Sequence, residues 1–74
     1  MQSSPSQRAV KQEELIRLAE VMTKLPEAQR EAVVLHHLQG LSLAEVAQEM
    51  GKTEAAVAGL LFRGLKTLHN LLEE

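Results

Sequence analysis

Apolar residues recur along the chain with the spacing of α-helices, in four segments separated by short breaks. The first helix is expected from about Val10 to Lys24, and it should end before Leu25-Pro26 because a residue preceding proline is pushed out of the α region. Its inward stripe is expected to comprise Leu15, Leu18, Ala19 and Met22. Residues 1–9 are polar and rich in serine, so we expect a flexible arm or the stub of a linker there.

The next two segments carry sequence signals for helix ends. A second helix is expected to begin at Pro26, which suits a first helical turn, and to run to about Gln39, with Gly40 as a left-handed C-cap. A third, short helix is expected after Ser42, where Glu45 completes the spacing of a capping box. The residues expected to face inward are Ala28, Ala32, Leu35 and Leu38 on the second helix and Leu43, Val46, Ala47 and Met50 on the third, which Gly51 ends.

Thr53 is expected to cap a fourth helix that continues to about Leu72. On a helical wheel, its inward arc comprises Val57, Leu60, Leu61, Gly64, Leu65, Leu68, Leu71 and Leu72. The opposite face carries Phe62, the only Phe in a chain without Trp or Tyr. An exposed Phe on a small domain indicates a partner surface, whereas a rotated helix would make Phe62 a core residue.

Composition supports an all-α fold and excludes several functions. The 74 residues allow one domain, and the abundant Ala, Leu, Glu, Gln, Lys and Arg all favour helices. The chain has no cysteine and no apolar run of the roughly 20 residues that a membrane span needs, so we expect a cytoplasmic protein. A phosphate-binding loop and a nucleophile–base pair are missing, and His36 and His37 lack a third metal ligand. We therefore expect no enzyme, no cofactor and no metal.

The net charge of −2 argues against strong binding to DNA, because phosphates attract proteins through Lys and Arg. The charges are unevenly distributed. Residues 25–51 carry Arg30 against four glutamates, whereas residues 52–66 are locally basic. DNA binding thus remains compatible with the sequence, but only a weak intrinsic affinity is expected.

Residues 42–65 have the pattern of a helix-turn-helix motif: a short helix, a tight turn at Gly51-Lys52-Thr53, and a second capped helix. Ala47 is small enough for the two helices to cross closely, and Val57 would be the matching inward residue. In such motifs the second helix enters the major groove of DNA with its N-terminal end. A helical hairpin with a glycine turn can imitate the pattern.

On the outer face of this second helix, the side chains suit contact with DNA. Phe62 could contact a thymine methyl group, and Arg63 and Lys66 could reach phosphates or a guanine edge. Ordinary solvated charges remain the alternative for Arg63 and Lys66.

Three segments resemble region 4 of the sigma-70 family. Leu25-Pro26-Glu27-Ala28-Gln29-Arg30-Glu31 is similar to its LP-x-x-x-R-E opening, and Gly40 to Ala47 is similar to its G-L-S-x-x-E-I-A segment. The frame V-x-x-x-L-x-R-x-x-x-x-L of its recognition helix matches Val57, Leu61, Arg63 and Leu68. The resemblance covers about Glu14 to Glu73 and is closest to the extracytoplasmic-function (ECF) branch, whose members consist of little more than regions 2 and 4.

This resemblance implies an all-α, four-helix domain of the winged-helix-like class over residues 10–74, with a C-terminal helix-turn-helix. It also implies recognition of the promoter minus-35 element, docking on the β-subunit flap of RNA polymerase, and an anti-sigma factor as a further partner. Bases would face Ala58, Gly59 and Phe62, and backbone phosphates would lie near Arg30 and Ser42. The full set of expected DNA-binding residues is Arg30, Ser42, Lys52, Thr53, Ala55, Ala58, Gly59, Phe62, Arg63 and Lys66.

One departure from the family concerns the recognition helix. The family usually has basic or polar residues just after the valine, whereas Ala58-Gly59-Leu60 carries no side-chain hydrogen-bond donor here. Either the helix lies close to the bases and reads shape and methyl groups, or base-specific reading is weak.

Two other functions fit the same pattern. A response-regulator output domain looks alike but normally dimerises to read two half-sites. A protein-interaction module could use the acidic middle or Phe62 to bind a partner such as an anti-sigma factor. The LP-x-x-x-R-E opening favours the sigma interpretation, for which we expect a monomer whose tethering to polymerase substitutes for affinity. We also expect the chain to be a fragment, because region 4 alone lacks the region that melts promoter DNA.

Overall fold

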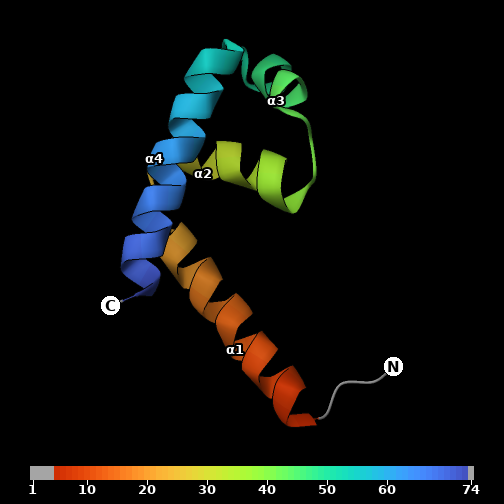
Figure 1. Cartoon of the computed structure of the whole chain (residues 1–74), viewed down its shortest axis with the longest axis vertical. Helices are drawn as coiled ribbons and strands as arrows, with labels where there is room; N and C mark the ends of the chain where they lie inside the picture. The colour runs from red at the N-terminus through yellow and green to blue at the C-terminus, as the bar shows by residue number, and fades with distance from the viewer. Residues whose placement is uncertain (1–4, 74) are drawn as a thin grey trace.

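The computed structural model describes residues 5–73 and, from Gln12 onwards, their side chains. The elements are α1 (Pro5–Met22), α2 (Glu27–Val33), the π-helical turn η1 (Val34–Leu38), α3 (Leu43–Met50) and α4 (Glu54–Leu72). No strand occurs in this part of the chain, which confirms the predicted all-α fold. Figure 1 shows α4 along one side of the molecule, with α2 crossing it, α3 beside its N-terminal end, and α1 extending away from the other helices.

The helix ends around α3 and α4 confirm the predicted caps. The Ser42 hydroxyl accepts a hydrogen bond from the Glu45 backbone at 3.1 Å, and the Ser42 backbone donates to Glu45 Oε1 at 2.8 Å. Gly51 ends α3 in the left-handed region, with φ 66°, which suits a residue without Cβ. Thr53 begins α4, where its Oγ1 accepts from the Ala56 backbone at 3.0 Å. Gly51 and Thr53 thus set the length of the turn between α3 and α4 and the point at which α4 begins.

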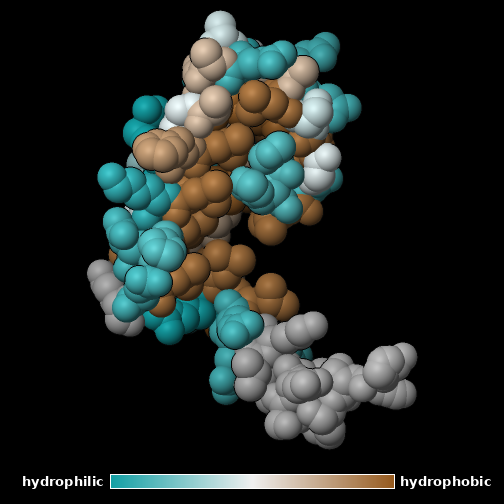
Figure 2. Space-filling model, in the orientation of Figure 1, coloured by the Kyte–Doolittle hydropathy of each residue, from teal (hydrophilic) through white to brown (hydrophobic). Residues whose placement is uncertain are grey.

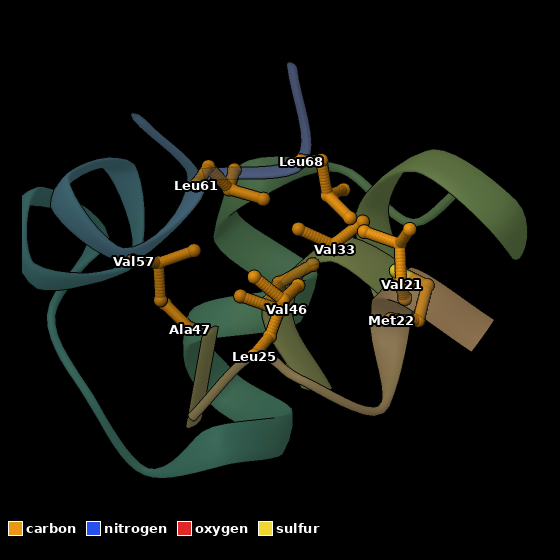
Figure 3. Packing of buried hydrophobic residues seen from close by; sticks show 10 residues of the cluster. Val21, Met22, Leu25, Val33, Val46, Ala47, Val57, Leu61 and Leu68 are labelled. Carbon is orange, nitrogen blue, oxygen red and sulfur yellow. The ribbon is translucent and has the colours of Figure 1, made fainter. Parts of the chain in front are cut away.

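The core lies where α2, α3 and α4 meet the last turn of α1. Val46 on α3 and Val57 on α4 are completely buried, and Figure 3 shows Val57 beside Ala47 between these two helices. The buried apolar residues are Val21, Met22, Leu25, Ala32, Val33, Val46, Ala47, Val57, Leu61 and Leu68. Five of the twelve residues predicted to face inward on α3 and α4 belong to this core, and five more are partly buried against it. The core therefore holds the two helices of the motif together.

Helix α2 crosses α4 at Gly64, where the two backbones approach closely. A Cβ atom at this position would lie 3.2 Å from Val33 Cγ2 and 3.5 Å from Gln29 Cβ. A methyl group would therefore press on the neighbouring helix. The absence of a side chain at Gly64 lets α2 support the middle of α4.

The first helix departs from the prediction in two ways. It begins at Pro5 instead of about Val10, since proline is compatible with a first helical turn; residues 1–4 of the predicted arm lie outside the described residues. The predicted inward stripe is wrong for Leu15, which is 64% exposed, and for Ala19, which is also exposed. Only the end of α1 reaches the core, because the helix diverges from α4 towards its N-terminus (Figure 1).

A groove between α1 and the end of α4 results from this divergence. It is lined by Glu14, Leu15, Arg17, Leu18 and Leu72. Arg17 Nη2 donates to the Leu72 backbone oxygen at 2.8 Å and so ties the two helices together. Leu18 is half-buried here, as its place in the predicted stripe suggested.

The second helix does not continue as an α-helix to Gln39. Its last turn is the π-helical η1, in which the Gln39 backbone donates to the Val34 oxygen, five residues earlier, at 2.9 Å. A π-turn holds one residue more than an α-turn. Residues towards its end, such as Leu38, therefore point in a different direction from the one they would have in a continuous α-helix. Leu38, predicted to face inward, is consequently 61% exposed, whereas Ala32 is buried and Leu35 half-buried.

Candidate nucleic-acid interface

Helices α3 and α4 form the predicted helix-turn-helix. Their junction is closed by a hydrogen bond from the Lys52 backbone to the Ala47 oxygen at 2.9 Å, just after the left-handed Gly51. Ala47 and Val57, which are 6% and 0% exposed, lie where the two helices cross. The small Ala47 side chain permits this crossing, as expected from the sequence. The junction is therefore rigid, and it fixes which face of α4 points outward.

The outward face of α4 carries the side chains predicted to meet DNA. Phe62 is 69% exposed, which overturns the alternative that it belongs to the core. Ala55, Ala58, Arg63 and Lys66 are exposed with it, and Gly59 is half-buried. We call these six residues, 55, 58, 59, 62, 63 and 66, the outer face of α4. Figure 2 shows apolar side chains along α4 and its neighbours, with polar side chains beside them.

The positive charges near this face have no carboxylate partner within the described side chains. Lys52 lies in the turn, and Arg63 and Lys66 lie on α4; all three are exposed. An ion pair joins His69 and Glu73 at 3.4 Å, and none is recorded for Lys52, Arg63 or Lys66 among the described residues. We call Lys52, Arg63 and Lys66 the basic group. Their charges are thus available to phosphates; Glu54 is the acidic residue nearest in sequence to Lys52 and Arg63, and Glu73 the one nearest to Lys66.

Two hydroxyl groups lie at the N-terminal ends of the motif's helices. Ser42 and Thr53 are exposed, and each hydroxyl oxygen accepts a backbone hydrogen bond within its own cap. Each hydroxyl retains its hydrogen as a donor. Helix N-termini also favour anions, so both caps suit a phosphate of the DNA backbone.

Arg30 is placed differently from the other predicted residues. It lies on α2, is half-buried, and donates from Nη1 to the Leu25 backbone oxygen at 3.4 Å. Within the described residues, the structure records no hydrogen bond or ion pair between Arg30 and the outer face of α4. Its first role is therefore to support the connection between α1 and α2.

Leu65, predicted to face inward, is a surface residue. It is 41% exposed, although it was included in the inward arc of α4. Leu65 sits at the edge of that arc, three residues after Phe62, and the core does not reach this edge. Its position at the rim of the helical wheel was the signal that could have identified it.

Other kinds of site find little support in the described residues. No group of three or more His, Cys, Asp or Glu among them is placed to hold a metal ion. None of the described helices is both long and apolar enough to cross a membrane.

A short helix, a three-residue turn and a capped second helix with an exposed, cation-bearing face define a helix-turn-helix protein. Comparison with known proteins identifies the family. Residues 15–68 match the family model described as "Sigma-70, region 4". The chain belongs to the sigma-70 family, as a region 4 of the ECF type.

Individual relatives agree with this assignment. The chain is 44% identical over 57 residues to the ECF RNA polymerase sigma factor BldN of Streptomyces coelicolor, a match covering 77% of this chain and 22% of that protein. It is 35% identical over 66 residues to the ECF RNA polymerase sigma factor SigD of Mycobacterium tuberculosis, with 89% and 31% covered. The chain thus spans less than a third of the length of these curated relatives.

A solved structure matches the fold. The structure of an RsbN–BldN complex aligns with a TM-score of 0.75 and 38% sequence identity, over 88% of this chain and 47% of that chain. Fold and family therefore agree with the resemblance found in the sequence.

Proposed function

We propose that this chain recognises the minus-35 element of promoter DNA as region 4 of an ECF sigma factor, while docked on the β-subunit flap of RNA polymerase. The observation that carries the proposal is the outer face of α4. One side of α4 is buried in the core, which fixes the orientation of the helix. Its other side exposes the Phe62 ring and the cations Arg63 and Lys66 on the second helix of a helix-turn-helix. Membership of the sigma-70 family supports the same assignment and counts against a response-regulator output domain.

The contacts follow from the position of each group. The N-terminal half of α4 enters the major groove, where Phe62 packs against thymine methyl groups or sugar edges. Lys52 and Lys66 pair with phosphates, and the hydroxyls of Ser42 and Thr53 donate to phosphate oxygens. Nη1 of Arg30 donates to the Leu25 backbone oxygen, so Arg30 would contact a phosphate only through its other guanidinium N–H groups.

Weak intrinsic affinity is part of this function. The chain has a net charge of −2, so the basic group acts against a background of repulsion between protein and DNA. Attachment to polymerase raises the local concentration of the domain near the promoter, and that concentration compensates for affinity. The domain then works as a monomer in the cytoplasm.

Protein partners have a separate surface available to them. Leu15 and Ile16 on α1 are 64% and 60% exposed, and apolar patches of this kind are often buried by partners. The BldN relative is found in a complex with RsbN, which supports regulation of this chain by a bound protein such as an anti-sigma factor.

The test is NMR shift mapping with a duplex that carries a minus-35 element, beside a scrambled duplex of the same composition. We expect perturbations concentrated in residues 52–66 and larger for the promoter duplex. Perturbations confined to α1 or α2 would refute the assignment of α4 as the recognition helix. Sedimentation of the free chain should show a monomer.

A further inference from the structure

The Arg63 side chain folds back along α4 and lies over Gly59. A Cβ atom at position 59 would be 3.4 Å from Arg63 Nη1, 3.8 Å from Nη2 and 3.9 Å from Cζ. Three atoms of the guanidinium group at such similar distances show that the group itself, and not only its tip, rests on this part of the helix. Residues four apart share a helix face, and long side chains point towards the N-terminus, so this direction is a favourable one.

The place that the guanidinium occupies is available because position 59 is glycine. A side chain longer than a methyl group would extend into the same volume. Apart from the backbone of α4 itself and the two neighbouring residues, the three atoms nearest to a Cβ at this position all belong to Arg63. Unlike Gly64, Gly59 is not needed for the close packing of another helix, because the nearest side-chain atoms belong to α4 itself. Its presence is therefore not explained by packing, although glycine inside a helix is destabilising relative to alanine.

This arrangement alters the chemistry of the N-terminal half of α4. Ala55, Ala58 and Gly59 have no side-chain donor, although they lie in the part of the helix that enters the groove first. The guanidinium of Arg63 brings a planar fork of N–H donors about one turn closer to that end. Among the described side chains it has no hydrogen-bond or ion-pair partner, so its donors are available.

We propose that Arg63 reads a guanine in the major groove from the level of position 59, and that Gly59 is the positioning residue that leaves room for it. The inference rests on the proposed function, namely that α4 is the recognition helix. Guanine is the expected base because its O6 and N7 acceptors match the guanidinium fork. The donor missing from Ala58-Gly59-Leu60 is thus supplied from one turn further along the helix.

The experiment uses the whole chain and a minus-35 promoter duplex in which each guanine in turn is replaced by 7-deazaguanine, which lacks the N7 acceptor. Affinities are measured by fluorescence anisotropy at low salt. For the wild type, we expect one replacement to weaken binding about tenfold, the size of one lost hydrogen bond from a charged donor. Arg63→Ala should bind both versions of that duplex equally, because alanine has no side-chain donor for the N7 acceptor.

Two substitutions at position 59 distinguish an effect on the position of the Arg63 guanidinium from an effect on the stability of α4. Gly59→Ala is the matched control: its Cβ meets the guanidinium at ordinary contact distance, so the ratio between its affinities for the guanine and 7-deazaguanine duplexes should stay about tenfold, whatever the affinities themselves are. Gly59→Leu should displace the guanidinium and abolish the penalty. Both residues favour helices more than glycine does, so the melting temperature of neither variant should fall below that of the wild type.

The outcomes distinguish this inference from the proposed function. If Gly59→Leu retains the full penalty, Gly59 does not position Arg63. If no guanine replacement weakens wild-type binding while NMR still maps the duplex to α4, the inference is wrong and the proposed function stands. If the duplex does not bind, or binds elsewhere on the chain, the proposed function fails and the inference fails with it.

Discussion

Two adjacent residues of α4, Leu61 and Phe62, provide the sharpest test of how this helix is oriented. Leu61 is 7% exposed and belongs to the core, whereas Phe62 is 69% exposed. Truncating a buried leucine to alanine removes its packing and leaves a cavity, at a cost of about 3 kcal/mol. For a domain of this size, that cost lowers the melting temperature by roughly 12–24 °C.

The Phe62→Ala variant should behave in the opposite way. Less than a third of the Phe62 surface is covered, and alanine has the higher helix propensity by a few tenths of a kcal/mol. The two effects largely cancel, so the melting temperature should change by no more than about 5 °C, equivalent to about 1 kcal/mol. Affinity for promoter DNA should fall by about fivefold or more, as for an interface residue worth at least about 1 kcal/mol.

Thermal unfolding followed by circular dichroism measures the first effect, and anisotropy titration of a labelled duplex measures the second. The two variants differ by one position in the sequence, so each serves as the control for the other. If Phe62→Ala destabilised the chain as much as Leu61→Ala, the ring would be a core residue and the outer face of α4 would not exist. If it were stable and bound DNA normally, Phe62 would not contact DNA.

Three further predictions address the electrostatics, the cap and the π-turn. If Lys52 and Lys66 each pair with a phosphate, log affinity should fall with log salt with a slope of about −1.8, so that binding weakens about twelvefold between about 50 and 200 mM salt; a flat salt dependence would contradict phosphate pairing. Thr53→Ala should lower the free energy of unfolding by about 1 kcal/mol, whereas Thr53→Ser should retain most of the cap; equal losses in urea unfolding would count against the hydrogen bond to Ala56. Leu38→Gln should change stability by no more than about 0.5 kcal/mol because the residue is exposed, whereas Val33→Ala on the same helical segment should cost about 2 kcal/mol; a large loss for Leu38→Gln would show that η1 does not turn it outward.

The features that depend on neighbouring residues were predictable from the sequence. The capping box of Ser42 and the left-handed Gly51 are set by hydrogen bonds and backbone freedom within a few residues. The orientation of α4 was also predictable, because its leucine-rich arc is wide and continuous. When this arc packs against the core, the opposite face of α4 points to solvent, and Phe62 lies on that face.

Other features required the folded structure: a missing neighbouring helix for Leu15, and the local conformation of a helical segment for Leu38 and Arg63. Leu15 was predicted to be buried because its spacing matches a helical stripe, yet that spacing cannot show whether another helix is within reach. The π-turn at Val34–Leu38 shifts Leu38 outward through a hydrogen-bond register that no periodicity reveals. The position of the Arg63 guanidinium likewise depends on the empty space at Gly59, which exists only once α4 has formed.

By itself, then, the sequence determined four helices, their caps, the helix-turn-helix and the family, because these follow from local hydrogen bonding, helical periodicity and short motifs. Only the tertiary structure decided how much of α1 packs against the other helices and that Leu38 points to solvent at the end of the second helix. It also decided where the guanidinium donors of Arg63 lie along α4. Each of these depends on distances between residues that are separated along the chain or along the helix, and the order of residues does not contain those distances.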